Sequence, residues 1–252
     1  MKITDKPDLY DLLYNDVTED IAMYLELLKD QIKVLEFGCG TGRITIPLAQ
    51  AGHELEAVDL SPQMLNGLKT KINKDPQMLK NIKPVLGDMV NYKAKHKYEA
   101  IIIPLTSFNY LTTEGQQLNC LKNIAQNLTE DGFAIIELLS KKTFTEIEDS
   151  NKLKFIKNII INQDEYYQYY RQTSLDMATR EISQQRLFNH INHGKIITKE
   201  VVEWSNRFVT INDFQNLVAH TPLIIEAIYG DCQLGAYDEN SPDVFVKLRR
   251  KI

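Results

Sequence analysis

The sequence contains no long apolar run and only three cysteines. No stretch reaches the roughly 18 to 20 apolar residues that a membrane-spanning helix needs, and residues 1–9 lack the apolar core of a secretory signal. Cys39, Cys120 and Cys232 are too widely spaced for a metal site or a disulfide framework. We therefore expect a cytoplasmic protein with no membrane span and no metal centre.

Basic charge is also scarce. The 252 residues carry 29 Lys and Arg against 34 Asp and Glu, which gives a formal net charge of -5. The dense basic run at residues 247–251 fits a solvated strand edge better than a nucleic-acid patch. This balance argues against nucleic acid as a partner, although a local patch can still bind RNA. The length suits one large α/β domain with an embellishment, or two small domains.

Glycine is concentrated where a buried strand ends. Residues 33–37 form a mostly apolar run, and Gly38, Gly40 and Gly42 follow at every second position before a helical pattern begins. Such a turn brings backbone N–H groups close to an anionic ligand group. The usual dinucleotide fingerprint would place its third glycine at Arg43, and the carboxylate of Glu36 would repel a pyrophosphate. Glu36 instead suits an ammonium group, while the loop N–H groups suit a neighbouring carboxylate.

The segment Glu36-Phe37-Gly38-Cys39-Gly40-Thr41-Gly42 resembles the first motif of the class I S-adenosylmethionine-dependent methyltransferases. The resemblance implies S-adenosylmethionine as the cofactor. It also implies a Rossmann-like, seven-stranded, mostly parallel sheet with helices on both faces, whose last strand is antiparallel between its neighbours. The alternation of apolar strand patterns and helical patterns up to residue 138 also predicts an α/β fold with a parallel sheet.

Acidic residues follow two further predicted strands. Asp59 ends the strand at residues 55–59, where a carboxylate can accept both hydroxyls of a ribose. Asp88 follows the strand at 82–86, where the resemblance implies a contact with adenine. Tyr10 and Tyr14 match a Tyr-Asp-x-x-Tyr segment that covers the cofactor in many small-molecule methyltransferases, with core packing as the alternative. The residues expected to contact the cofactor are Tyr10, Glu36, Gly38, Cys39, Gly40, Gly42, Arg43, Asp59, Leu60, Asp88, Met89 and Ile103.

The pattern changes after Ser140. Residues 143–149 fit a short helix, and the Tyr-, Gln- and Ile-rich region that follows fits three antiparallel strands, at about 165–175, 180–191 and 195–208. We expect residues 1–140 and 209–252 to form the cofactor-binding domain. Residues 141–208 would form an antiparallel β cap, inserted after the fifth strand as a substrate lid. The cap also offers a surface for a homodimer.

Candidate residues for the acceptor site come from three segments. Phe108 and Tyr110 follow the predicted strand at 99–103, at the sheet edge where ligands bind in open α/β folds. Arg186 and His190 share one face of a predicted cap strand. We expect Phe108, Tyr110 and Arg186 to contact the substrate. His190 and Tyr14 are the catalytic candidates, with a structural role in the cap or core as the alternative.

The expected function is methyl transfer from S-adenosylmethionine to the N or O of a small-molecule acceptor. Two alternatives are an RNA methyltransferase and a non-catalytic S-adenosylmethionine-binding protein. The glycine spacing and Glu36 argue against a nicotinamide oxidoreductase. The sequence identifies neither the acceptor nor the oligomeric state.

Overall fold

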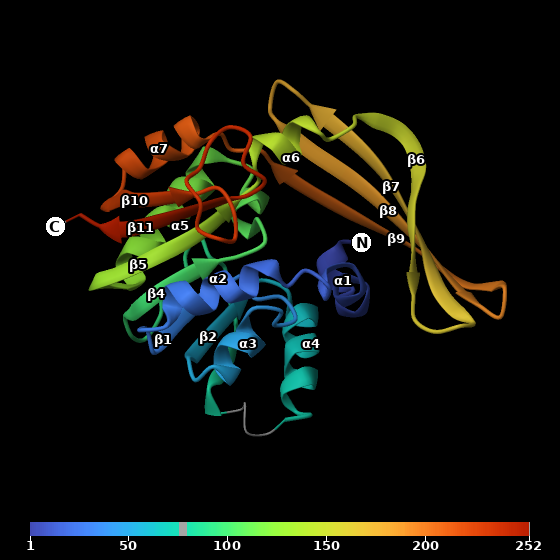
Figure 1. Ribbon diagram of the computed structural model, residues 1–252, viewed down its shortest axis with the longest axis horizontal. Helices are drawn as coiled ribbons and strands as arrows, with labels where there is room; N and C mark the ends of the chain where they lie inside the picture. The colour runs from blue at the N-terminus through green and yellow to red at the C-terminus, as the bar shows by residue number, and fades with distance from the viewer. Residues whose placement is uncertain (76–79, 252) are drawn as a thin grey trace.

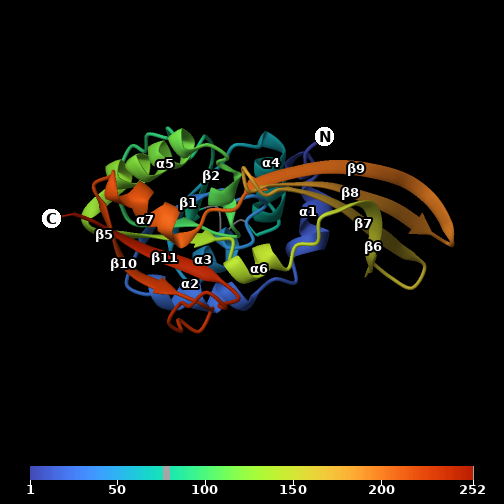
Figure 2. The ribbon, with the colours of Figure 1, turned by 90° about the horizontal axis from the view of Figure 1, so that it is seen from above.

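The computed structural model describes residues 1–75 and 80–251, whose strands form two sheets (Figures 1 and 2). The larger sheet has the strand order β10-β11-β5-β4-β1-β2-β3, and the smaller one has the order β6-β7-β8-β9. The strands of the larger sheet are β1 (Lys33–Phe37), β2 (Glu54–Asp59), β3 (Ile82–Leu86), β4 (Tyr98–Ile103), β5 (Leu128–Leu138), β10 (Leu223–Tyr229) and β11 (Val244–Arg250). The strands of the smaller sheet, the cap sheet, are β6 (Ser150–Ile160), β7 (Glu165–Asp176), β8 (Glu181–Asn192) and β9 (Lys195–Arg207).

Helices cover both faces of the seven-stranded sheet. One face packs against α2 (Glu19–Leu28), α3 (Thr45–Gln50) and α4 (Pro62–Ile72), and the other against α5 (Glu114–Asn127) and α7 (Ile211–Ala219). Figure 2 shows α2 and α3 on the side of the sheet opposite α5 and α7. Alternate strand residues supply the two cores, because successive side chains of a strand point to opposite faces. Leu35 and Phe37 therefore join one apolar cluster while Val34 joins the other.

The strand directions confirm the predicted fold class. β1 pairs in parallel with β2 and β4, β2 with β3, and β4 with β5. β11 lies between β5 and β10 and is antiparallel to both. Parallel strands place their carboxyl ends at one edge of the sheet, so the loops after β1, β2 and β4 meet there.

The N-terminal segment lies between the two sheets (Figure 1). It forms the short 3-10 helix η1 (Ile3–Asp5) and α1 (Pro7–Tyr14). On one side Leu9 packs with Phe188 and Val202 of the cap sheet. On the other side the Thr41 hydroxyl lies 2.5 Å from the Asp11 carboxylate, which joins α1 to the glycine loop.

The cap sheet has four strands, so the expectation of three was wrong. The missing strand is β6, whose residues are almost all exposed. It therefore lacks the alternation of buried and exposed positions that identifies a strand in a sequence. The short helix α6 spans Lys141–Thr145 rather than 143–149 because the Ser140 hydroxyl accepts the Thr143 N–H at 3.0 Å. The homodimer through the cap stays a prediction.

None of the described helices has both the length and the apolar character needed to cross a membrane. No cluster of three or more His, Cys, Asp or Glu in residues 1–75 and 80–251 has the arrangement of a metal site.

Asn109 connects the seven-stranded sheet to both ends of the cap. It lies in the 3-10 helix η3 (Ser107–Tyr110), after β4, and its side chain is 0% exposed. Its Nδ2 donates to the Arg207 carbonyl at 2.7 Å, and its Oδ1 accepts the Leu139 N–H at 3.0 Å. Leu139 follows β5 and Arg207 ends β9, so one amide joins the points where the chain enters and leaves the cap.

We predict that Asn109→Ala lowers the free energy of unfolding by about 2 to 4 kcal/mol, because it leaves a buried N–H and a buried carbonyl without partners. Urea unfolding measures the change. Asn151→Ala, at an exposed position of β6, is the matched control and should stay within about 0.5 kcal/mol of the parent. Equal losses in the two variants would contradict this role for Asn109.

Candidate active site

The glycine loop requires glycine for both conformation and space. Gly38, Gly40 and Gly42 have φ angles of 71°, 56° and 92°, in the left-handed region that other residues rarely adopt. A β-carbon on Gly38 would lie 2.8 Å from the Ser107 hydroxyl, and one on Gly42 would lie 2.5 Å from the Leu68 side chain. The loop is therefore packed closely between the segment after β4 and helix α4.

Asp59 lies beside this loop at the end of β2. Its Oδ2 accepts the Gly40 N–H at 2.8 Å and its Oδ1 accepts the Ser61 N–H at 2.8 Å. Burial raises the pKa of Asp59, and these backbone hydrogen bonds act in the opposite direction. Because a carboxylate oxygen has more than one lone pair, both oxygens can still accept a ligand hydroxyl. The position next to the loop is the one expected for a ribose-binding carboxylate.

Two glutamates, the buried Glu36 and the half-buried Glu137, lie under the same edge of the sheet. Glu36 is 1% exposed, and its Oε2 lies 2.6 Å from the Thr45 hydroxyl. Glu137, on β5, accepts the Leu105 N–H at 2.6 Å. Burial raises the pKa of each glutamate to about 8. Both are therefore mostly protonated at pH 7, and a ligand cation placed against either one would favour its ionised form.

The Arg43 side chain is held away from the loop opening. Its guanidinium makes two hydrogen bonds to Asp20 of α2, at 2.6 and 2.7 Å, and a third to the Val17 carbonyl at 2.8 Å. Both side chains of the pair are 7% exposed. Arg43 thus anchors α2 to the loop, and only its backbone is left for a ligand. The sequence signal for Asp20 was an acidic residue at helical spacing from the apolar Met23 and Tyr24.

Helix α1 covers the loop with tyrosines. The Tyr10 ring faces Gly40, where a β-carbon would lie 3.7 Å from it. The rings of Tyr10 and Tyr14 are 4.8 Å apart between centroids. Burial raises the pKa of Tyr10 well above its usual value, so its phenol stays protonated. Both tyrosines are therefore placed near the loop, as the sequence predicted.

Apolar side chains lie exposed at the ends of β2 and β3. Leu60, directly after Asp59, is 69% exposed, and Leu86, the last residue of β3, is 61% exposed. Asp88 is close by in sequence, and its Oδ1 accepts the Val90 N–H at 2.9 Å. Met89 is half-buried against the core. Leu86 was not among the predicted site residues, although its place at the end of a strand next to β2 was the available signal.

Three predicted site residues have their side chains in the apolar clusters of the core. Cys39 is 4% exposed, and burial raises its thiol pKa well above the usual value. Ile103 is 0% exposed within the sheet. Phe108 is also 0% exposed, with its ring packed edge-on against Phe214 at 5.5 Å. Any ligand contact from Ile103 or Phe108 would have to come from the backbone in this conformation.

Side chains of the cap sheet meet α1 and η3 in one cluster. Arg186 of β8 donates from Nη1 to the Tyr14 hydroxyl at 3.0 Å, and its guanidinium lies 5.0 Å from the centre of the Trp204 ring. The Trp204 indole N–H donates to the Tyr110 hydroxyl. The structure thus brings the predicted residues Tyr14, Tyr110 and Arg186 together. Trp204 was not predicted, although its signal was a lone tryptophan on an expected cap strand.

The structure does not bring His190 into this cluster. It lies four positions beyond Arg186 on β8. Its ring stacks on Tyr167 at 4.5 Å, and its Nε2 lies 2.8 Å from Glu165. These contacts are within the cap sheet itself. A catalytic role for His190 stays a prediction without a contact to the glycine loop.

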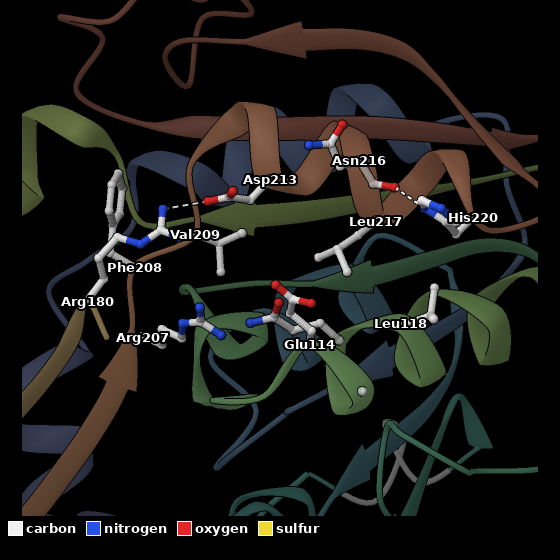
Figure 3. Close-up of a pocket in the computed structure, with 12 residues that line it drawn as sticks. Glu114, Leu118, Arg180, Arg207, Phe208, Val209, Asp213, Asn216, Leu217 and His220 are labelled. Carbon is white, nitrogen blue, oxygen red and sulfur yellow. Dashed lines mark hydrogen bonds and ion pairs between the residues drawn. The ribbon is translucent and has the colours of Figure 1, made fainter. Parts of the chain in front are cut away.

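A separate cavity of about 340 Å³ lies between α5, α7 and the segment after β9 (Figure 3). Arg180 and Asp213 form an ion pair of 2.5 Å at its edge. Its lining includes none of the residues predicted to contact the cofactor or the acceptor. The glycine loop, rather than this cavity, is therefore the candidate active site.

Comparisons with known proteins agree with this assignment. Residues 34–132 match the family model described as a methyltransferase domain. This segment of the chain is therefore similar to methyltransferase domains. Solved structures with this fold include two described as holding S-adenosylmethionine, the cofactor that the glycine motif implied. The matched residues include Glu36, the glycine loop, Asp59 and Asp88.

Three relatives illustrate the match. The malonyl-[acyl-carrier protein] O-methyltransferase of Bacillus anthracis is 26% identical over 186 residues, which are 73% of this chain and 62% of that protein. An S-adenosylmethionine-dependent methyltransferase from Clostridium acetobutylicum has a TM-score of 0.79, 19% identity and coverage of 97% of each chain. The sugar N-methyltransferase KedS8 from Streptoalloteichus has a TM-score of 0.72, 15% identity and coverage of 96% of this chain and 93% of that chain. These two structural matches show a shared fold.

The curated relatives match over only part of their length. Three further curated methyltransferases are covered over 53%, 51% and 60% of their sequences.

We predict that Asp20→Asn destabilises the protein by about 3 kcal/mol or more, because it leaves the Arg43 cation buried without its counter-charge. Chemical denaturation measures the loss. A double variant, Asp20→Leu with Arg43→Met, should recover most of it, since no unpaired charge remains. Glu26→Gln breaks an exposed pair with Lys29 and is the control, which should leave the unfolding midpoint unchanged. A double variant no more stable than Asp20→Asn would contradict the argument.

Proposed function

We propose that this protein transfers a methyl group from S-adenosylmethionine to the nitrogen or oxygen of a small-molecule acceptor. The observation that carries the proposal is the pair of carboxyl groups beside the glycine loop. Glu36 and Asp59 come from the neighbouring strands β1 and β2, and Asp59 is hydrogen-bonded to the loop itself. An amino-acid group and a ribose would therefore each have a binding carboxyl group at the same edge of the sheet.

The residues at the loop fit the cofactor part by part. Backbone N–H groups of the loop suit its carboxylate, and Glu36 suits its ammonium group. Asp59 suits the ribose hydroxyls, while the exposed Leu60 and Leu86 offer apolar surface to the adenine ring. The bound cofactor supplies a methyl group on a sulfonium, which is already activated for transfer.

The chain's own contribution is alignment and the exclusion of water. Tyr10 and Tyr14 cover the loop from α1, and the Arg186–Trp204 face of the cap lies behind Tyr14. Such a cover holds the acceptor atom in line with the reacting carbon, which is a large part of the catalysis needed here. We assign the lid role to residues 141–208, because they bring Arg186 and Trp204 to this cover.

Two observations support a small acceptor. The net charge of -5 does not favour RNA. Proteins with the same fold include ones described as an amino pentose methyltransferase and a sugar N-methyltransferase. RNA methylation and cofactor binding without turnover are the alternative outcomes of the assays below.

We predict that S-adenosylmethionine and S-adenosylhomocysteine bind, and that their binding at pH 7 releases protons. Glu36 has a raised pKa of about 8, so it is mostly protonated before binding, and a ligand ammonium group would ionise it. Calorimetric titration in buffers of different ionisation enthalpy measures the release. Glu36→Gln should abolish that release, and Asp59→Ala should weaken binding about 100-fold or more by removing a charged hydrogen-bond acceptor.

Methylthioadenosine, which lacks the amino-acid group, is the ligand control and should bind without proton release. NAD is titrated in parallel. Binding of NAD alone would overturn the proposed function. Proton release that persists in Glu36→Gln would remove Glu36 from the ammonium site while leaving cofactor binding intact.

We predict that Tyr14→Phe lowers kcat/KM by about 10-fold or more once an acceptor is found, because its ring packs beside Tyr10 and its hydroxyl accepts from Arg186. His190→Ala should change kcat/KM by less than about threefold, since its contacts stay within the cap. Steady-state methyl transfer measures both variants. The reverse order of effects would restore His190 as the catalytic residue.

A further inference from the structure

Arg186 is a buried cation without a counter-charge in the described part of the chain. It is 5% exposed, and the ion pairs among residues 1–75 and 80–251 do not include it. Its Nε and Nη2 donate to the Gln184 amide oxygen at 3.1 and 2.9 Å, and its Nη1 donates to the Tyr14 hydroxyl at 3.0 Å. All of these partners are neutral. By contrast, the similarly buried Arg43 is paired with Asp20 through both terminal nitrogens.

The hydrogen bonds of Arg186 do not use all the N–H groups of its guanidinium. A guanidinium carries five N–H groups, and the three hydrogen bonds above occupy three of them. Two N–H groups remain, one on each terminal nitrogen, with no acceptor among the described residues. Two N–H groups on the terminal nitrogens of an arginine match the two oxygens of a carboxylate.

Arg186 is joined to the proposed active site by a short series of side-chain contacts. Its partner Tyr14 lies 4.8 Å from Tyr10, which in turn faces Gly40 of the loop. Burying an unpaired charge is costly unless a partner completes the site. Arg186 is therefore linked to the glycine loop through the two tyrosines of α1.

We propose that the acceptor carries a carboxylate, which pairs with the two unused N–H groups of Arg186 and fixes the acceptor against Tyr14 and Trp204. This inference rests on the proposed methyltransferase function, because it assigns the acceptor of that site. Arg186 is then a specificity-determining residue. It selects acidic acceptors over neutral ones of similar size.

The charge balance favours a carboxylate over a phosphate. One buried cation neutralises one negative charge, whereas a phosphate monoester carries nearly two at pH 7. Arg171 faces Arg186 from β7 in the strand register, but it is exposed, so water screens its charge. The other polar groups at this point, the hydroxyls of Tyr14 and Tyr110 and the Trp204 indole, are neutral.

The test is a binding experiment on the full chain saturated with S-adenosylhomocysteine, so that the cofactor's own carboxylate site is occupied. The probes are two matched sets: 4-aminobenzoate, its methyl ester and 4-aminophenylphosphonate, and β-alanine, its methyl ester and 2-aminoethylphosphonate. Calorimetry or ligand-detected NMR measures each affinity. We expect at least one carboxylate to bind about 10-fold or more tightly than its ester and its phosphonate.

Variants assign the preference to Arg186. Arg186→Gln should remove the carboxylate preference while changing the affinity for S-adenosylhomocysteine by less than about twofold, and Arg186→Lys should retain part of it. Arg171→Gln removes an exposed charge from the neighbouring strand and should retain all of it. If Arg186→Gln does not fold, the parent protein alone tests the proposal: its carboxylate affinity should still exceed its ester affinity about 10-fold or more.

Each other outcome contradicts the inference. Equal or tighter binding of the esters would mean that Arg186 does not select a carboxylate, and tighter binding of a phosphonate would assign a different anion. No binding of either carboxylate at millimolar concentration, or an unchanged preference in Arg186→Gln, would also overturn it. Failure to bind S-adenosylhomocysteine would instead count against the proposed methyltransferase function, so the two failures can be distinguished.

Discussion

The hydrogen bond from the Gly40 N–H to Asp59 is the interaction on which the site depends. It joins the middle of the glycine loop to the end of the neighbouring strand, and it requires the left-handed backbone that only glycine adopts readily. Tyr10 of α1 lies over Gly40, 3.7 Å from the place of a β-carbon, which is an ordinary contact distance. Asp59 thus fixes the loop by a bond between residues 19 positions apart, and α1 packs onto the loop that this bond holds in place.

The protein treats its buried charges in two different ways, and the difference separates structure from function. Arg43 and Asp20 neutralise each other completely and connect α2 to the loop, so their role is to hold the scaffold. Glu36 and Glu137 lack such partners, and burial keeps them mostly protonated at pH 7. Arg186 cannot lose its proton, since the pKa of a guanidinium is too high. It can only be neutralised from outside the chain, which is why its surroundings point to a ligand.

The sequence predicted the cofactor half of the site better than the acceptor half. The glycine spacing, Asp59 and the α/β alternation depend on local chain geometry, which a sequence pattern records directly. The sequence did not show that the Arg43 side chain pairs with Asp20, because that pair is set by helix packing and not by the loop motif. β6 was missed because a strand exposed on both faces has no period-two pattern. Trp204 meets Tyr110 across 94 residues of sequence, a contact that only the folded cap creates.

The backbone after β4 shows how the two halves are held together. Leu105 and Thr106 have φ angles of 48° and 54°, a left-handed conformation that costs a side-chain-bearing residue about 1 to 2 kcal/mol each. The strain is held by the Leu105 N–H, which donates to the half-buried Glu137 at 2.6 Å. The resulting turn packs Ser107 against Gly38 and directs Tyr110 toward Trp204. One strained turn therefore positions both Ser107 beside the glycine loop and Tyr110 in the proposed acceptor site. A change at one of these places must be accommodated at the other.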